Sequence, residues 1–125
     1  QVMAAAISSH LKKIDLFHSL HHSTKTTPLL LQNAWDVISA KQMETCGAEA
    51  IATTSLGMSA VFGYQDGERL PFDTLFHLLK CMARVTQVPL SVDFEAGYGR
   101  TPEEICNKVQ KLIEIGIVGI NIEDA

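Results

Sequence analysis

The chain has 125 residues, of which 46% are apolar and 19% charged, and ten Lys and Arg against fourteen Asp and Glu give a formal net charge of −4. This composition is typical of one packed globular domain and excludes a disordered chain. The acidic balance argues against an electrostatic nucleic-acid surface, and no apolar run reaches the roughly 18 residues of a membrane span. Neither nucleic acid nor a membrane is therefore expected as a partner.

The first part of the chain, residues 1–27, is expected to be an outer helix followed by a polar linker. Apolar residues recur at helical spacing across 3–22, and the linker is expected over 21–27. His18 and His22 are four residues apart, a spacing that metal ligands use, but they lack a carboxylate partner, which favours a solvated surface. Because residues 2–7 are too short for the apolar core of a signal peptide, we expect a cytoplasmic protein.

From residue 28 onward, apolar runs alternate with amphipathic helical patterns. Strands are predicted over 28–34, 50–55, 89–95 and 119–124, with helices that begin at Asp36, Asp73 and Thr101. The run 28–34 is continuous enough to be a strand covered on both faces. The last of these helices has the strongest signals, because Pro102 follows the N-cap, Glu104 completes a capping box and Gly116 ends it. Such alternation predicts a parallel sheet, either doubly wound or a (β/α)8 barrel.

The segment 57–69 lacks clear periodicity and contains three glycines. It is longer than the usual βα connection of roughly 2 to 6 residues, which favours a functional loop. Phe62 and Tyr64 are expected to anchor this loop over the site. Trp35 either forms part of the same wall or packs in the core.

The chain stops at Ala125, directly after the last predicted strand. A βα unit normally continues with a helix that covers its strand, so residues 28–125 are expected to be the first half of a barrel and the chain to be a fragment. An alternative hypothesis is an inactive half-barrel that serves as an assembly or interaction module, because open sheet edges need a partner.

Polar side chains collect where each predicted strand ends. They are Asn33, Trp35, Asp36, Thr53, Thr54, Ser55, Asp93, Glu95, Glu123 and Asp124. In a parallel barrel this rim builds the active site. Asp93 and Glu95 are two residues apart on one strand, so both point to the same face. Their repulsion favours a cation such as Mg²⁺ between them, although either could instead cap a helix or pair with Arg100.

Other signals at the rim are weaker. Asp66 and Glu123 could join a ring of carboxylates around the ion, although Asp66 also fits an ordinary turn. The run 53–57 is either an anion-binding nest or a polar strand exit. The GxG at 97–99 is not a dinucleotide fingerprint, because Pro102 occupies the third glycine position.

The three cysteines are widely spaced and form no CxxC pair. They are Cys46, Cys81 and Cys106, and each falls inside a predicted helix. We expect inert, buried, reduced thiols, because a zinc site would need clustered ligands.

Four segments in order resemble the isocitrate lyase and phosphoenolpyruvate mutase superfamily: NAWDVISA (33–40), GAEAIATTSLGMSAVFGYQDGE (47–68), VPLSVDFEAGYG (88–99) and GIVGINIEDA (116–125). The resemblance implies a (β/α)8 TIM barrel, of which this chain covers an N-terminal helix and about the first half. It implies a lyase or phosphonomutase that acts on a C–C, C–P or C–O bond of a small α-oxo acid, its enolate or a phosphonate. Mg²⁺, with Mn²⁺ as an alternative, and a homo-oligomer, usually a tetramer, belong to the same expectation.

The resemblance also implies metal ligands. Asp93 corresponds to the direct metal ligand, and Glu95 to the second acidic position, where the family usually has a shorter Asp. Asp66 and Glu123 correspond to carboxylates that usually reach the ion through water.

It further implies substrate contacts. Thr54, Ser55 and Leu56 correspond to the backbone that binds the substrate carboxylate, with Ser55 in place of a phosphonate-binding glycine. Trp35 and Tyr64 are expected to complete the substrate pocket. The catalytic Cys or Asn of the family would lie after Ala125, so the catalytic residue is unknown and no cysteine here is assigned that role.

Overall fold

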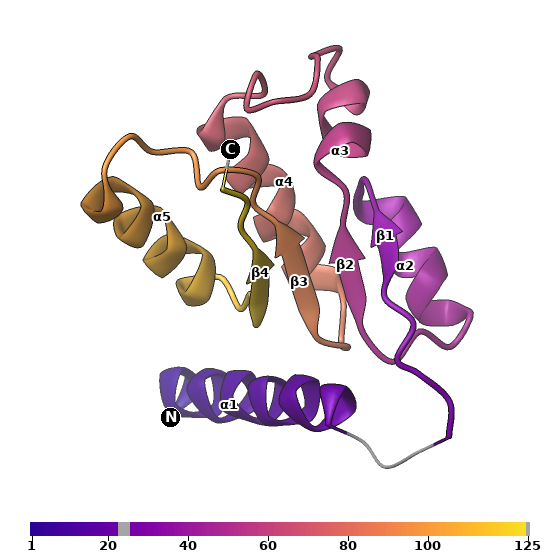
Figure 1. Cartoon of the computed structure of the whole chain (residues 1–125). Coiled ribbons are helices and arrows are strands. Elements are labelled where there is room, and N and C mark those ends of the chain that lie inside the picture. Colours follow the sequence, from indigo (N-terminus) through magenta and orange to yellow (C-terminus); the bar gives the residue numbers. More distant parts are fainter. Residues whose placement is uncertain (23–25, 125) are drawn as a thin grey trace.

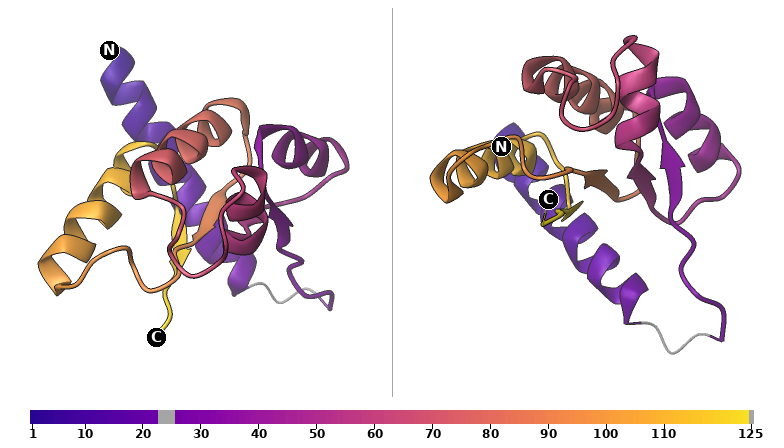
Figure 2. Two further views of the ribbon diagram at one scale, coloured as in Figure 1. Left: turned by 90° about the horizontal axis from the view of Figure 1, so that it is seen from above. Right: turned by 45° about the horizontal axis from the view of Figure 1, so that its top comes forward.

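The computed structural model describes residues 1–22 and 26–124, so the expected linker lies partly outside the described residues. Its elements follow the chain as α1 (Val2–His21), β1 (Gln32–Ala34), α2 (Val37–Thr45), β2 (Ile51–Thr53), α3 (Ser55–Val61), α4 (Phe72–Val85), β3 (Leu90–Asp93), α5 (Pro102–Glu114) and β4 (Gly119–Asn121). Helices α2, α4 and α5 lie on one side of the sheet, and α1 passes beneath the strands (Figures 1 and 2). The predicted alternation is confirmed, with shorter strands.

The four strands are parallel and stand in the order β1-β2-β3-β4. Ile51 pairs with Leu90 and Asp93 pairs with Asn121, so adjacent strands end at the same edge. A doubly wound sheet reverses its strand order at a switch point, whereas a barrel adds each strand beside the previous one. The sequential order is therefore that of a barrel sector.

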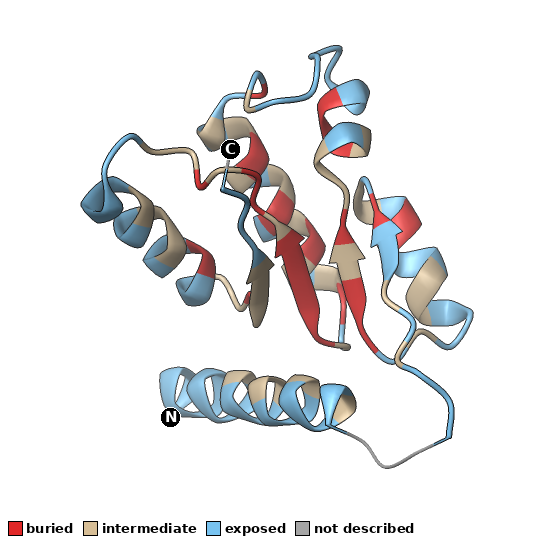
Figure 3. Ribbon diagram, viewed as in Figure 1, coloured by how far each residue is buried: buried red, intermediate tan, exposed pale blue. Residues whose placement is uncertain are grey.

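The core lies between β2, β3 and the helices behind them (Figure 3). Phe94, Ile51, Met58, Leu79 and Leu112 are among its fully buried side chains. The prediction that 28–34 is covered on both faces is wrong, because in this run only Ala34 is buried. Strand β1 is at the edge of the sheet, where Leu30 is 74% exposed.

Two helix boundaries follow their predicted signals. Asp36 Oδ1 accepts the Ser39 N–H at 2.7 Å, and Ser39 Oγ accepts the Asp36 N–H at 3.0 Å, which completes a capping box for α2. In α5, Thr101 Oγ1 accepts the Glu104 N–H at 3.2 Å. The Glu104 carboxylate binds the N–H of Arg100 at 2.7 Å rather than that of the N-cap, so the predicted box is displaced by one residue.

Two boundaries differ from the prediction. Helix α4 has Pro71 as its N-cap, without a side-chain cap bond, and Asp73 lies in its first turn rather than at the cap. The supposed loop after β2 begins as α3, since Thr54 Oγ1 accepts the Gly57 N–H at 3.2 Å and starts a helix. Only residues 62–71, called here the lip segment, connect α3 to α4.

The cysteines are free, as expected, but they are not a buried set. Cys46 is the C-cap of α2 and is exposed, and Cys106 is exposed on α5. Only Cys81 is partly covered. The expectation of buried thiols is therefore wrong.

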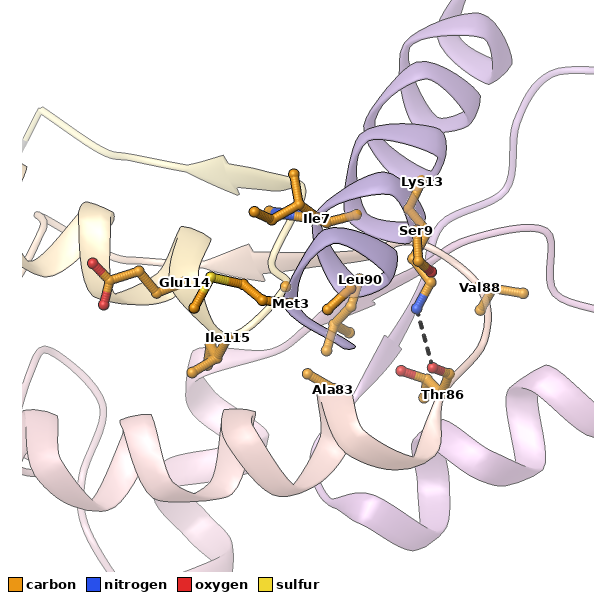
Figure 4. A pocket seen from close by; sticks show the side chains of 13 residues that line it. Met3, Ile7, Ser9, Lys13, Ala83, Thr86, Val88, Leu90, Glu114 and Ile115 are labelled. Carbon is orange, nitrogen blue, oxygen red and sulfur yellow. Dashed lines mark hydrogen bonds between the residues drawn. The ribbon is translucent and has the colours of Figure 1, made fainter. Parts of the chain in front are cut away.

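Helix α1 runs across the amino ends of the strands and contributes no buried residue. His10 Nε2 lies 3.1 Å from the Ile117 carbonyl, and Lys13 Nζ donates to the Thr86 carbonyl at 3.4 Å, the contact dashed in Figure 4. A pocket of about 580 Å³ lies between α1 and the ends of α4 and α5. None of the described helices combines the length and apolarity needed to cross a membrane.

Candidate active site

The carboxyl ends of β2 and β3 meet at Asp93. Its N–H donates to Thr53 Oγ1 at 3.0 Å, and its Oδ2 accepts the Ser55 N–H at 3.1 Å. Oδ1 accepts a longer bond of 3.4 Å from the Glu95 N–H. The half-buried Asp93 carboxylate is thus fixed at the rim, and each oxygen retains a lone pair for a further partner.

Glu95 is 7% exposed and has a left-handed backbone, with φ of 49°. Its Oε1 accepts the N–H groups of Gly67 and Glu68 at 3.0 and 2.9 Å. Its Oε2 accepts the Tyr98 hydroxyl at 2.6 Å. The Glu95 carboxylate therefore binds the lip segment, whereas the Asp93 carboxylate binds the start of α3.

Glu68 makes the reciprocal contacts. Its Oε1 accepts the N–H groups of Ala96 and Tyr98 at 3.0 and 2.8 Å. Both amides belong to residues 94–101, called here the β3–α5 segment. Sequence reasoning missed Glu68 and Tyr98, because no spacing connects a turn glutamate to a tyrosine that lies 30 residues later.

Tyr98 joins this polar group to the core. Its ring stacks on Phe94, with ring centroids 5.5 Å apart, and lies 6.0 Å from the ring of Phe72. Burial raises the pKa of the Tyr98 phenol, and the hydrogen bond to Glu95 and the negative charges of Glu95, Glu68 and Asp93 raise it further. The negative charges of three carboxylates therefore act together to keep the Tyr98 phenol protonated.

The residues predicted to form the wall of the site are partly exposed. Trp35 is 44% exposed, so it is not a core residue, and its Cβ lies beside Gly57 of α3. Phe62 and Tyr64 are 42% and 43% exposed, so they do not anchor the lip segment as predicted. The lip segment is held instead by the Glu95 carboxylate and by the buried Leu70.

The four predicted metal carboxylates are not gathered into one cage. Asp66 and Glu123 are exposed, and Glu123 contacts Glu95 through its N–H, which donates to the Glu95 carbonyl at 2.7 Å. Within residues 1–22 and 26–124, no three His, Cys, Asp or Glu side chains are arranged to hold a metal ion. The donor set fits an ion bound directly by Asp93 with water in its other positions, as Mg²⁺ accepts, and does not fit a closed carboxylate cage.

Comparison with models of protein families shows which family the chain belongs to. The model of the phosphoenolpyruvate phosphomutase family matches residues 17–125. The chain belongs to this family. The described strands are accordingly part of a (β/α)8 barrel of the phosphoenolpyruvate mutase and isocitrate lyase type, as the sequence resemblance implied.

Relatives of this family member are known by sequence and by structure. An uncharacterized protein of Mycobacterium tuberculosis is 41% identical over 87% of the chain and 40% of its own length. The 2-methylisocitrate lyase of Escherichia coli is 30% identical over 81% of the chain and 34% of its own length. The chain thus spans 34 to 40% of the length of these two curated relatives.

Solved structures align over almost the whole chain. A candidate phosphonomutase from Burkholderia cenocepacia J2315 has a TM-score of 0.85 and 38% identity, covering 91% of this chain and 46% of that one. A phosphonopyruvate hydrolase, solved in complex with oxalate and Mg²⁺, has a TM-score of 0.81 and 22% identity, covering 90% of this chain and 38% of that one. The second likeness concerns the fold alone.

Proposed function

We propose that the protein is a Mg²⁺-dependent lyase or phosphonomutase that acts on a small α-oxo acid, its enolate or a related phosphonate, with Mn²⁺ as an alternative ion. The matching family model is that of a phosphomutase and one relative is a 2-methylisocitrate lyase, which supports the reaction class. Oxalate, an enolate mimic, and Mg²⁺ are both named for the phosphonopyruvate hydrolase neighbour, which supports the ligand class.

One contact carries the proposal. Ser55 N–H lies 3.1 Å from Asp93 Oδ2, which joins the start of α3 to the end of β3. The backbone proposed to bind the substrate carboxylate, 54–56, is therefore adjacent to the carboxylate proposed to bind the ion. An α-oxo acid bound to an ion at Asp93 would then lie beside the start of α3.

The residues of the chain then have separate tasks. Asp93 would hold the ion directly, and the exposed Asp66 and Glu123 would hold it through water. Bound there, Mg²⁺ would supply a Lewis acid that stabilises negative charge on the substrate oxygens, an effect worth several kcal/mol. Trp35 and Tyr64, each nearly half exposed, would bound the substrate pocket.

Calorimetric titration of the full-length protein with Mg²⁺ and oxalate tests this proposal. Asp93→Ala should abolish the binding of both, because the directly bound carboxylate is lost. Asp15→Ala is the matched control, since Asp15 is an exposed carboxylate on α1, far from the rim. No binding by the unmodified protein, or equal binding by the Asp93→Ala variant, would refute the proposal.

The proposal extends to assembly. By its family resemblance the protein is a homo-oligomer, with a tetramer as the expected state. Light scattering on the full-length protein gives its mass directly, and a monomer at micromolar concentration would contradict this part.

A further inference from the structure

Two connections at the rim each supply a glutamate to the backbone of the other. Glu95, in the β3–α5 segment, accepts the N–H groups of Gly67 and Glu68 in the lip segment. Glu68, in the lip segment, accepts the N–H groups of Ala96 and Tyr98 in the β3–α5 segment. Four hydrogen bonds of 2.8 to 3.0 Å, each from a backbone amide to a carboxylate oxygen, thus join the two segments. The bonded residues are 27 to 30 positions apart in the sequence.

The backbone at this junction is strained in the same way on both sides. Glu68, Glu95 and Tyr98 have φ values of 59°, 49° and 56°, and they are the non-glycine residues with positive φ in the described ranges. A left-handed backbone is unfavourable for such residues and persists only where surrounding contacts hold it. Here the backbone is held by the hydrogen bonds of the Glu95 and Glu68 carboxylates to the four amides, and by the hydrogen bond that the Tyr98 hydroxyl donates to Glu95 Oε2.

We propose that Glu68, Glu95 and Tyr98 form a reciprocal clasp that fixes the lip segment over the rim, and that Glu95 is a positioning residue of the site rather than a metal ligand. The clasp fixes the backbone of Gly67, which immediately follows Asp66. This second half of the inference rests on the proposed function, because it concerns the ion that Asp93 would hold. The clasp itself does not.

The contacts of Glu95 favour this role over ligation. Its two oxygens already accept three hydrogen bonds, and its side chain is 7% exposed. Turning Oε1 toward an ion near Asp93 would break its two bonds to the Gly67 and Glu68 amides, and turning Oε2 would break its bond to the part-buried Tyr98 hydroxyl. The clasp requires the length of the Glu95 side chain. An aspartate at this position is one carbon shorter, so its carboxylate would lie about 1.5 Å short of the Gly67 and Glu68 amides.

Two substitutions separate the clasp from ligation. Glu95→Gln keeps the length and an acceptor oxygen for the lip amides but removes the charge, and the Tyr98 hydroxyl can accept from the new amide. Glu95→Asp keeps the charge and restores the residue that the family usually has there, but it loses the reach. The clasp therefore predicts that Gln is the milder change, whereas direct ligation predicts that Asp is.

Amide hydrogen exchange in the full-length protein, without metal, tests the clasp alone. Glu95→Asp and Glu68→Ala should each raise exchange at all four bridged amides, of Gly67, Glu68, Ala96 and Tyr98, by about tenfold or more. Glu95→Gln should leave most of the protection in place. Reciprocity is overturned if each variant exposes only the two amides that its own carboxylate binds, or if none of the four is protected in the unmodified protein.

Calorimetric titration with Mg²⁺ then tests the positioning role. Glu95→Gln should change the affinity by less than about threefold, and Glu95→Asp should weaken it by about tenfold, the loss typical of a displaced supporting contact. Glu103→Gln and Glu103→Asp, at an exposed glutamate of α5, control for the same chemical changes. A large loss of Mg²⁺ affinity in Glu95→Gln, together with retained affinity in Glu95→Asp, would show that Glu95 is a ligand and would overturn the inference. Absent Mg²⁺ binding in the unmodified protein overturns the proposed function, while the exchange result still decides the clasp.

Discussion

The two ends of the sheet are held by different forces. At the carboxyl end, carboxylates bind backbone amides across the rim, and three residues are held in a left-handed conformation. At the amino end, α1 lies across the strands with few hydrogen bonds and no buried residue. Directional bonds fix geometry, whereas loose apolar packing mainly covers surface. The contrast matches a barrel in which the chemistry belongs to the rim at the carboxyl ends of the strands.

The largest effect is expected beneath the clasp. Phe94→Ala removes a fully buried ring that supports Tyr98 and should lower the free energy of unfolding by about 3 to 5 kcal/mol. Phe17→Ala removes a partly exposed ring of α1 that packs against Gly119, and about 1 kcal/mol is expected. Urea denaturation of both variants measures the difference. Equal losses would mean that α1 is as firmly packed as the rim.

The amino end has one strong polar contact, at Glu44. Burial alone would raise the pKa of this carboxyl, but hydrogen bonds from Lys41 and from the amides of Gln87 and Val88 outweigh it and hold the pKa below its usual 4.5. The ionised form is thus favoured by folding, so its stabilisation is present above pH 4.5 and is lost as the pH falls through the lowered pKa.

Glu44→Gln should therefore cost about 1 kcal/mol near neutral pH and progressively less below pH 4.5. Urea denaturation at several pH values measures this. A cost that is independent of pH would show that the charge of Glu44 is unimportant. A cost as large as that of Phe94→Ala would remove the contrast between the two ends.

A smaller effect is expected at the cap of α5. Thr101→Ala removes the acceptor for the Glu104 N–H and should cost about 1 kcal/mol or less, because Thr101 is exposed. Thr101→Ser keeps the acceptor and serves as the control. Thermal melting measures both variants, and an identical loss for Ala and Ser would show that the hydroxyl does not act as a cap.

The smallest effect on stability is expected at Asp66. Its side chain is exposed, so Asp66→Asn should change the free energy of unfolding by less than about 0.5 kcal/mol. It should nevertheless weaken Mg²⁺ and oxalate binding together, because the rim loses one charge. A large drop in melting temperature with unchanged binding would show that Asp66 is only a turn residue.

The contrast between the ends also explains what the sequence could predict. The alternation of elements, the cap at Asp36 and the positive φ of Gly47 and Gly116 after α2 and α5 follow from local patterns and were predictable. Helix α3 was missed because it has only seven residues, which are too few to show a helical periodicity in the sequence. Leu30 was expected to be covered but is exposed, because coverage depends on neighbours that the local sequence does not specify.

At the site, residue types were predictable and their partners were not. The acidic pair at the end of β3 was visible in the sequence, and Asp93 lies at the rim as expected. The turn of Glu95 toward the lip segment depends on its positive φ and on amides that come 27 and 28 residues earlier. No periodicity carries that information, so the sequence could not predict the contacts of Glu95 with the lip segment.

A crystal structure of the full-length protein with Mg²⁺ and oxalate tests the central claim most directly. The account predicts an ion about 2.0 to 2.1 Å from an Asp93 carboxylate oxygen, with oxalate beside residues 54–56 and Glu95 still bound to the amides of Gly67 and Glu68. An ion coordinated by the Glu95 carboxylate, or bound away from the carboxyl ends of the strands, would contradict it.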